Sequence, residues 1–450
     1  MPRSSAPRRQ RPRSSRSSST CRGRRRTPRS GWRPRSRAGS RPRPESRSTT
    51  LSPGPRRSAA TTAERQHDIV LFGATGFTGG LTAEYLAAHA PETTRWALAG
   101  RNREKLEGVR SRLATTNPRC AELPLLQAHT GDAAAIRDLA DSTRVVISTA
   151  GPYILHGEPL VAACAASGTH YVDLTGEPEF VDLMWLRYHD QAERSGARIV
   201  HSCGFDSIPY DLGALFTVEQ LPEGLPIALE GFVRARGTFS GGTYHSALEI
   251  VGRLRQAQRV AAQRREIEPR PEGRRVRGIR GKPHEQSDAG GWVVPFPTID
   301  AQNVLRSARA LDRYGPDFSY SHYLVAGPLP VMAGIIAAGA GLVALAQLAP
   351  ARDLLGRLKD PGEGPSPEQR AKGWFRVRMV ARADGTRLVT EISGGDPGYG
   401  ETSKMLAESA LCLAHDELPE RAGQLTPAVA MGDALLARLR NAGIEFKVVE

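Results

Sequence analysis

Three glycines with the spacing G-x-x-G-x-x-G, Gly73, Gly76 and Gly79, are the residues best placed to bind a ligand. The first allows a tight turn, the second lets backbone N–H groups approach a pyrophosphate, and the third lets a helix pack closely on a strand. The first N–H groups of a helix also favour an anion, because they have no partner within the helix. We therefore predict a dinucleotide site. Its expected contacts are Gly73, Thr75, Gly76, Phe77, Thr78 and Gly79.

A second group of residues indicates which dinucleotide binds. NAD sites usually place an acid about 20 residues past the glycines, where it binds the ribose 2′-hydroxyl. Here the next strand ends without an acid at Gly100, and Arg101 follows. A guanidinium can bind a 2′-phosphate through two hydrogen bonds, and Asn102 and Lys105 are close enough in sequence to assist. The sequence therefore predicts NADP rather than NAD.

Two later turns complete the predicted cofactor site. Asp132 precedes a helix, and we expect it either to cap that helix or to lie near the adenine. Ala150, Gly151 and Pro152 follow a buried strand, at the edge where open α/β sheets bind their ligands. We expect this small-residue turn to lie beside the nicotinamide ribose.

Four side chains near these turns could supply a proton during a reduction. They are Tyr153, His156, Cys203 and Asp206. Each also has a structural interpretation: in the same order, a pocket wall, an exposed loop residue, a small buried side chain and a helix cap. The pattern does not choose among them, and water could supply the proton instead. The five cysteines include no C-x-x-C pair, so we expect no metal site and a reducing, cytoplasmic compartment.

Strands and helices must alternate to position these residues, and the apolar runs from Ile69 to His201 do alternate with helical patterns. The fold class predicted is α/β, a Rossmann-type doubly wound parallel sheet of six strands over residues 65–221. An inserted α+β domain is expected over 222–424. A helix and a strand over 425–450 are then expected to return to the first domain.

The inserted domain has a less regular pattern. We expect a strand over 227–236, a basic helix over 244–265, a mobile loop over 266–291 and a hairpin that turns at Asp384-Gly385. Residues 323–350 carry no charge and predict a helix over 331–348. This run is rich in alanine and glycine, so we expect it to contact lipid at the inner face of the plasma membrane, an acyl chain or a second subunit of a homodimer, without crossing a membrane.

Charge separates the amino-terminal tail from the rest of the chain. The 450 residues carry a net charge of +15, but residues 1–60 alone hold 19 arginines and one acid. Subtracting their +18 leaves −3 for the remainder, so no specific nucleic-acid partner is expected for the folded part. The tail of residues 1–64 is rich in Arg, Ser and Pro and poor in apolar residues, which predicts disorder.

Several sequence blocks in one order resemble the saccharopine dehydrogenase-like oxidoreductases, and in particular the actinobacterial trans-acting enoyl reductases. The blocks are GATGFTGG (73–80), LAGRN (98–102), STAGPY (148–153), YVDLTGE (171–177), HSCGFDSIPYDLGA (201–214), FSGGT (239–243), GDPGYGETSKM (395–405) and LTPAVAMGDALLARL (425–439). The resemblance implies NADPH-dependent reduction of an enoyl chain held by a polyketide synthase or acyl carrier, in lipid or glycolipid synthesis.

Two other functions stay open from the sequence. A saccharopine or amino-acid dehydrogenase would need basic residues around its substrate, but the turns at 151–157, 175–179 and 202–211 contain no Arg or Lys. A neutral acyl substrate suits these turns better. A non-catalytic nucleotide-binding scaffold on a membrane is the second alternative.

Overall fold

The computed structural model describes residues 65–237, 250, 252–296, 298–346 and 364–450. The tail predicted to be disordered, residues 1–64, lies outside the described residues, and so do the FSGGT block and the predicted start of the basic helix. The described part of the chain is built on two sheets.

The first sheet contains the predicted alternation of strands and helices. Its seven strands are all parallel, in the order β14-β6-β5-β4-β1-β2-β3. The strands are β1 (His67–Phe72), β2 (Trp96–Gly100), β3 (Leu125–Gln127), β4 (Thr143–Ser148), β5 (His170–Asp173), β6 (Arg198–Val200) and β14 (Gly423–Leu425). Every residue of β1 is buried, as expected of a strand that is covered on both faces.

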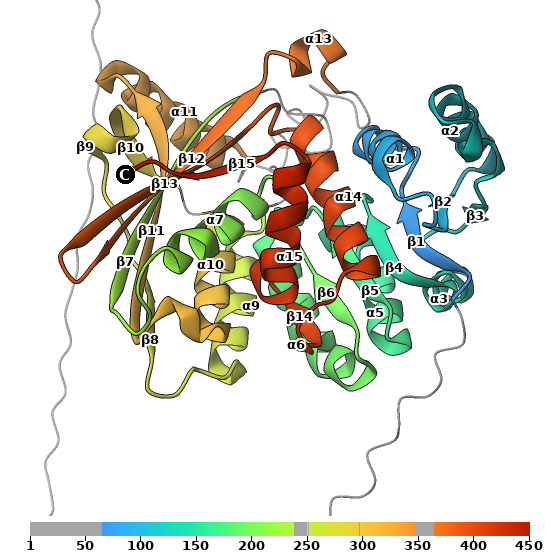
Figure 1. Cartoon of the computed structure of the whole chain (residues 1–450), viewed down its shortest axis with the longest axis horizontal. Coiled ribbons are helices and arrows are strands. Elements are labelled where there is room, and N and C mark those ends of the chain that lie inside the picture. The colour runs from blue at the N-terminus through green and yellow to red at the C-terminus, as the bar shows by residue number, and fades with distance from the viewer. Residues whose placement is uncertain (1–64, 238–249, 251, 297, 347–363) are drawn as a thin grey trace, which may run out of the picture. The chain divides into compact units, whose positions relative to one another are not determined.

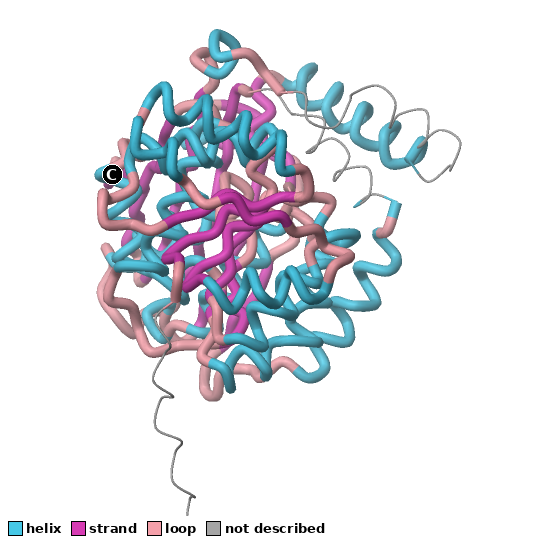
Figure 2. Tube along the Cα trace, turned by 90° about the vertical axis from the view of Figure 1, so that its right-hand side faces the viewer, coloured by secondary structure: helices cyan, strands magenta, loops and turns pink. Residues whose placement is uncertain are grey.

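Helices cover both faces of this sheet, which confirms the doubly wound class (Figures 1 and 2). Ile69 and Leu71 of β1 pack in one core with α1 (Phe77–His89), α2 (Arg103–Thr116) and α14 (Gly400–His415). Val70 and Phe72 pack in the opposite core. That core contains α3 (Ala133–Ser142), α5 (Glu158–Ser167) and α6 (Pro178–Ser195).

The second sheet is mixed, with the order β15-β13-β12-β7-β11-β10-β9 and with β8 paired to β11. Its strands are β7 (Ile227–Arg236), β8 (Arg275–Gly278), β9 (His284–Gln286), β10 (Gly291–Pro295), β11 (Asp317–Gly327), β12 (Trp374–Ala383), β13 (Thr386–Gly394) and β15 (Glu445–Val448). The predicted hairpin is β12–β13, and Asp384 and Gly385 both have positive φ, as a type I′ turn requires. The remaining helices are α4 (Tyr153–His156), α7 (Ile208–Glu219), α9 (Leu254–Ile267), α10 (Ile299–Ala310), α11 (Leu329–Ala346), α13 (Pro367–Arg370) and α15 (Pro427–Asn441).

Three expectations about the carboxyl-terminal part were wrong. The terminal strand β15 pairs with β13 of the second sheet and does not return to the parallel sheet. The parallel sheet instead gains a seventh strand, the three-residue β14, beside β6. Helix α14, which the sequence placed in the inserted domain, packs on β4 and β5. Strand pairing joins residues far apart in sequence, so local patterns do not determine it.

The prediction of a mobile loop over residues 266–291 was also wrong in part. It contains β8 and β9, which pair with β11 and β10. These strands are only four and three residues long and are rich in charge, so they lack the apolar alternation that reveals a strand.

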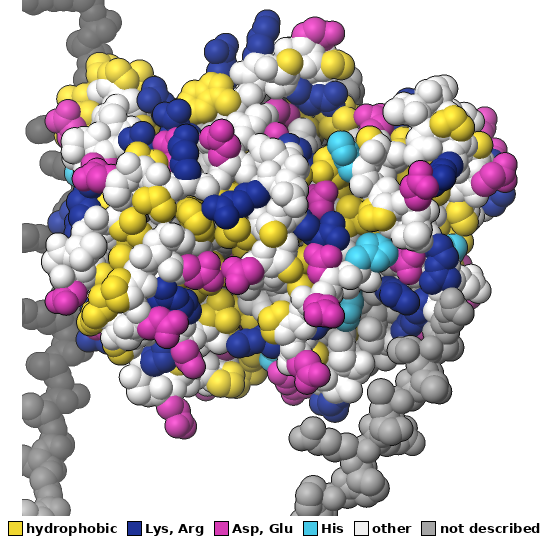
Figure 3. All heavy atoms as spheres, viewed as in Figure 1, with side chains coloured by type: hydrophobic (Ala, Val, Ile, Leu, Met, Phe, Trp, Pro, Cys, Tyr) yellow, Lys and Arg dark blue, Asp and Glu magenta, His cyan; other side chains and the backbone are white. Residues whose placement is uncertain are grey.

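The apolar run forms α11, which begins two residues before the predicted start. Met332 is buried against Val294 and Ala326, whereas Leu329, Val331 and Ile336 are about half exposed. Figure 3 shows hydrophobic side chains gathered on the surface over this helix. Within the described residues, no helix is both long and apolar enough to cross a membrane.

Candidate functional site

The three glycines lie between β1 and α1, and the structure separates their roles. Gly73 has φ +91°, and a Cβ there would lie 2.6 Å from Thr149 Oγ1. A Cβ at Gly79 would lie only 2.2 Å from the Gly73 carbonyl oxygen. The Thr149 hydroxyl also donates to the Phe72 and Gly73 carbonyls. Gly73 and Gly79 are therefore needed for the turn itself.

Gly76 differs from the other two because the turn does not need a glycine there. It has φ −80° and ψ 168°, and a Cβ would meet only the Gly73 oxygen, at 3.4 Å. Gly76 is exposed at the amino-terminal end of α1, and no side chain in the described residues caps that end. The uncapped N–H groups and the open space beside Gly76 fit a pyrophosphate.

The other predicted contacts of the dinucleotide lie around this turn. Thr75 is exposed, the Thr78 carbonyl accepts from the Thr82 hydroxyl, and the Phe77 ring packs edge-on against Tyr399 at 5.0 Å. Thr75 is therefore the side chain with most access to a ligand, while Phe77 also packs against the start of α14.

Arg101 lies at the carboxyl end of β2 and is exposed. Its guanidinium forms no hydrogen bond or ion pair within the described part of the chain, so it is available to a phosphate. Asn102 is committed elsewhere, because its side chain accepts from the Lys105 backbone N–H at 2.8 Å and caps α2. Asp132 caps α3 in the same way, accepting from Ala134 and Ala135 at 3.1 Å. An adenine contact of Asp132 stays a prediction.

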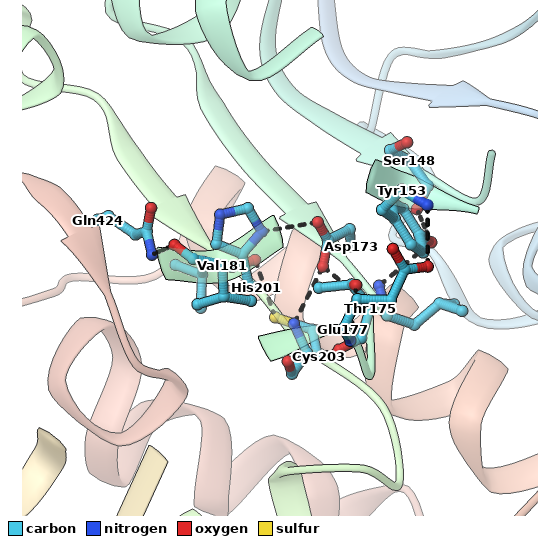
Figure 4. A network of polar contacts seen from close by, with 12 residues as sticks. Ser148, Tyr153, Asp173, Thr175, Glu177, Val181, His201, Cys203 and Gln424 are labelled. Atoms are coloured by element: carbon cyan, nitrogen blue, oxygen red, sulfur yellow. Dashed lines mark hydrogen bonds and ion pairs between the residues drawn. The ribbon is translucent and has the colours of Figure 1, made fainter. Parts of the chain in front are cut away.

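The carboxyl edge of the sheet is held by acids that the sequence analysis missed (Figure 4). After β4 come Ala150, Gly151 and Pro152, and then α4. The buried Glu177 carboxylate accepts from the backbone N–H groups of Tyr153 and Ile154, at 3.0 and 2.8 Å, and thereby holds the start of α4. The small-residue turn is thus fixed from the next strand along the sheet.

Asp173, the last residue of β5, organises the neighbouring turn. One carboxylate oxygen accepts from the N–H groups of Thr175 and Ser202 at 3.0 Å, and the other lies 2.7 Å from His201 Nδ1. Ser202 has φ +62°, which these contacts stabilise. The sequence blocks that carry the family resemblance contain Asp173, Glu177 and His201. A polar residue at the end of a buried strand is the feature that could have identified them as site residues.

Two of the four predicted proton donors are buried. The Tyr153 hydroxyl donates to the Ser148 carbonyl at 3.0 Å, and burial, with Asp173 nearby, raises its pKa well above the usual range. The Cys203 thiol lies 3.5 Å from the Val200 carbonyl, and burial, with Asp173 as a second cause, likewise raises its pKa. These shifts favour the neutral forms, and neither group faces solvent.

The other two donors are accessible. His156 is exposed at the end of α4. Asp206 lies over the end of β5, since a Cβ on Gly176 would be 3.1 Å from Asp206 Oδ2. Asp206 is exposed, and desolvation by the neighbouring protein atoms raises its pKa to about 6.

The structural interpretation of Asp206 as a helix cap was wrong, and its neighbour Ser207 does not cap the helix either. Ser207 occupies the cap position of α7 without capping it, and its hydroxyl accepts from Asn303 Nδ2 at 2.8 Å. The Asp206 carboxylate forms no hydrogen bond within the described residues. The Asp206 side chain therefore does not stabilise the start of α7, although the local sequence pattern suggested a cap there.

A second acid, on α10, lies close enough to Asp206 for its pKa to be raised by the Asp206 charge. Asp300, at the start of α10, is buried, and its pKa is raised well above the usual range by burial and by the charge of Asp206. His322 Nε2 lies 3.6 Å from Asp300, and His322 Nδ1 lies 2.9 Å from the Tyr320 hydroxyl. Burial lowers the pKa of His322 to about 3. The sequence analysis missed this group, which carries no recognisable motif.

Known proteins are similar to this chain over most of its length. Residues 69–200 match the family described as the saccharopine dehydrogenase NADP binding domain. A trans-acting enoyl reductase of Mycobacterium tuberculosis is 39% identical over 421 residues, covering 86% of this chain and 98% of the relative. One of Mycobacterium bovis is 37% identical over 417 residues, covering 85% and 97%.

Among solved structures, the saccharopine dehydrogenase (L-Glu forming) of Saccharomyces cerevisiae is similar with a TM-score of 0.50. The match covers 85% of this chain and 100% of that chain at 12% identity. At this identity the likeness shows a shared fold and carries nothing about the substrate.

Proposed function

Because the chain belongs to the family of trans-acting enoyl reductases, we propose that it reduces the carbon–carbon double bond of an enoyl thioester with NADPH. The chain is an NADP-dependent oxidoreductase. The observation that carries the proposal is the relationship over 98% of the relative's length. The saccharopine-type alternative is supported only by a distant fold relation.

The cofactor would be held by the α1 amino terminus, with Gly76 facing the pyrophosphate and Arg101 facing the 2′-phosphate. When bound, NADPH supplies a hydride. The turn at Ala150–Pro152, fixed by Glu177, orients the reacting groups at the sheet edge. The chain's own chemical task is then to deliver a proton to the substrate carbon that does not receive the hydride.

We infer that Asp206 is this proton donor. Its pKa of about 6 leaves part of the population protonated near neutral pH, and its carboxyl group is accessible above β5. General acids work best when their pKa lies close to the working pH. Burial and the charge of Asp206 raise the pKa of the neighbouring Asp300 well above the usual range, so Asp300 favours its neutral form and leaves Asp206 as the acid that titrates.

A direct assay tests the proposed reaction. The full chain is mixed with NADPH and crotonyl thioesters of N-acetylcysteamine, coenzyme A and an acyl carrier protein, and loss of absorbance at the NADPH band is followed. We expect oxidation of NADPH with formation of the saturated thioester. The relatives' description as trans-acting favours the carrier-bound substrate of a separate synthase. NADPH binding without turnover of any of the three would support the scaffold instead.

Cofactor choice gives a separate prediction. Arg101→Ala removes a charge-assisted contact with the 2′-phosphate, which is worth roughly 1.5–3 kcal/mol. The dissociation constant for NADPH should rise at least about tenfold, and that for NADH should hardly change. Fluorescence titration measures both. Arg103→Ala is the matched control, since Arg103 pairs with Glu107 on α2. Equal weakening of NADH and NADPH would remove Arg101 as the discriminating residue.

The exposed face of α11 gives a prediction about location. We infer that this face contacts lipid peripherally, because Leu329, Val331 and Ile336 are about half exposed. In cell fractionation, protein in the membrane pellet should be released by a carbonate wash, and Val331→Glu with Ile336→Glu should lower the pelleted fraction severalfold. Protein that stays in the pellet until detergent is added would contradict a peripheral contact.

A further inference from the structure

A cavity of about 330 Å³ lies away from the predicted cofactor site, between α6, α9, α10 and β14. β14 is the edge strand, and β6, β5 and β4 separate it from β1 and the glycine turn. The cavity is lined by residues from five stretches that are far apart in sequence, 181–189, 201, 264–271, 303–310 and 424–429. Neither the cofactor nor the proposed proton donor accounts for it.

Positive charge dominates this cavity. Arg264, Arg270, Arg306 and Arg309 line it, and Glu268 is the acid beside them. The buried Asp182 lies beneath, bonded to Arg264 at 3.0 Å and to Arg306. Asp182 and Glu268 pair with Arg264 and Arg306, whereas the half-buried Arg309 forms no ion pair within the described residues. Uncompensated charge in a partly buried site is costly unless a ligand or solvent pairs with it.

Several groups in the cavity have no partner. Arg306 Nη1 is buried without a hydrogen bond, and within the described residues Arg270 and Arg309 form no hydrogen bond or ion pair. Burial lowers the pKa of Arg306 to about 10, with Arg264 adding to the shift. Burial also lowers the pKa of Arg309. The charge of Glu268 opposes this shift, and the charges of Arg264 and Arg270 add to it. The charges of neighbouring guanidinium groups thus disfavour the charged forms of Arg306 and Arg309.

Two further polar groups complete the lining. His201 Nε2 and Gln424 Oε1 are both buried without a partner, and both residues line the cavity. Figure 4 shows His201 between Asp173 and Gln424, so its Nδ1 side is used by Asp173 and its Nε2 side is open. The Gln424 amide nitrogen donates to the Val181 carbonyl at 2.9 Å, which leaves the oxygen as an acceptor.

We infer that this cavity binds a compact oxyanion, the phosphate or carboxylate group of a small organic molecule. Guanidinium groups pair with such oxygens through two parallel hydrogen bonds, and the donors without a partner in the described part of the chain are Arg306 Nη1 and the Arg309 guanidinium. Gln424 Oε1 can accept from a hydroxyl on the ligand. Val181, Leu425 and Val429 form an apolar wall with room for a short hydrocarbon part.

Arg309 is the residue to change, because Arg264 and Arg306 also pair with Asp182 and support the fold. The full chain is first saturated with NADPH, so that its phosphate-binding turn is filled. Inorganic phosphate and succinate are then titrated by calorimetry at constant ionic strength. We expect one of them to bind, and Arg309→Gln to weaken it at least about tenfold. The anion that binds distinguishes a phosphate site from a carboxylate site.

Stability gives a second readout. In buffer without phosphate or carboxylate, Arg309→Gln should melt no lower than the parent chain, because it relieves repulsion among the arginines. Arg259→Gln on the exposed face of α9 is the matched control and should bind the anion like the parent. The inference is overturned if neither anion binds, if Arg259→Gln weakens binding as much as Arg309→Gln, or if Arg309→Gln lowers the melting temperature without changing anion affinity.

Discussion

Gly76→Val is expected to abolish NADPH binding while leaving the protein folded. The backbone at Gly76, φ −80° and ψ 168°, is open to valine, and the added Cβ would meet only one protein atom, at 3.4 Å. The side chain would instead fill the space that we assign to the pyrophosphate. Losing two charge-assisted contacts of roughly 1.5–3 kcal/mol each raises the dissociation constant at least about 100-fold.

Fluorescence titration with NADPH and circular dichroism together test this expectation. Gly79→Val is the contrasting variant, because its Cβ would lie 2.2 Å from the Gly73 oxygen. That substitution should unfold or strongly destabilise the domain, whereas Gly76→Val should melt close to the parent temperature. Normal NADPH affinity in Gly76→Val would mean that the glycine turn is structural and that the cofactor binds elsewhere.

Asp206→Asn should lower kcat for enoyl reduction by at least about 100-fold, the usual contribution of a general acid. The active form is the protonated carboxyl, so the sign of the pH dependence follows from its pKa of about 6. In the parent enzyme, kcat should fall about tenfold for each pH unit above 7. The variant should lose this dependence and still bind NADPH. Stopped-flow single turnovers across pH 5–8 measure the effect.

Stability provides a check that separates catalysis from folding. A carboxyl whose folded pKa is raised binds its proton more tightly in the folded state, so it favours folding at low pH and opposes folding once it ionises above pH 6. Asp206→Asn should therefore melt no lower than the parent at pH 7.5. A lower melting temperature together with an unchanged pH profile of kcat would make Asp206 a structural residue.

Asp211→Asn is the matched control for the pH profile. Burial raises the pKa of Asp211 to about 6 as well, but its two oxygens accept from the Ser307 hydroxyl at 2.5 Å and the Ala428 backbone N–H at 2.9 Å. Asp211 is fully buried and is part of the packing between α7, α10 and α15. Its substitution should lower stability and leave the pH dependence of kcat in place.

Local features of this protein could be predicted from its sequence. The glycine turn depends on the conformation of seven consecutive residues, so the spacing of Gly73, Gly76 and Gly79 is enough to indicate it. The hairpin at Asp384-Gly385 and the cap at Asp132 are equally local. The alternation of buried strands with helices likewise indicated the doubly wound sheet, because each element carries its own periodicity.

Only the tertiary structure decided which elements meet. The four-residue β15 joins a different sheet from the one expected, and the three-residue β14 was not predicted, since strand pairing is a long-range choice. Asp206 is exposed, whereas Tyr153 and Cys203 are buried. The sequence did not indicate this difference, because burial depends on the packing of the whole domain. The arginine-lined cavity draws on α6, α9, α10 and β14, so no single stretch of sequence contains it.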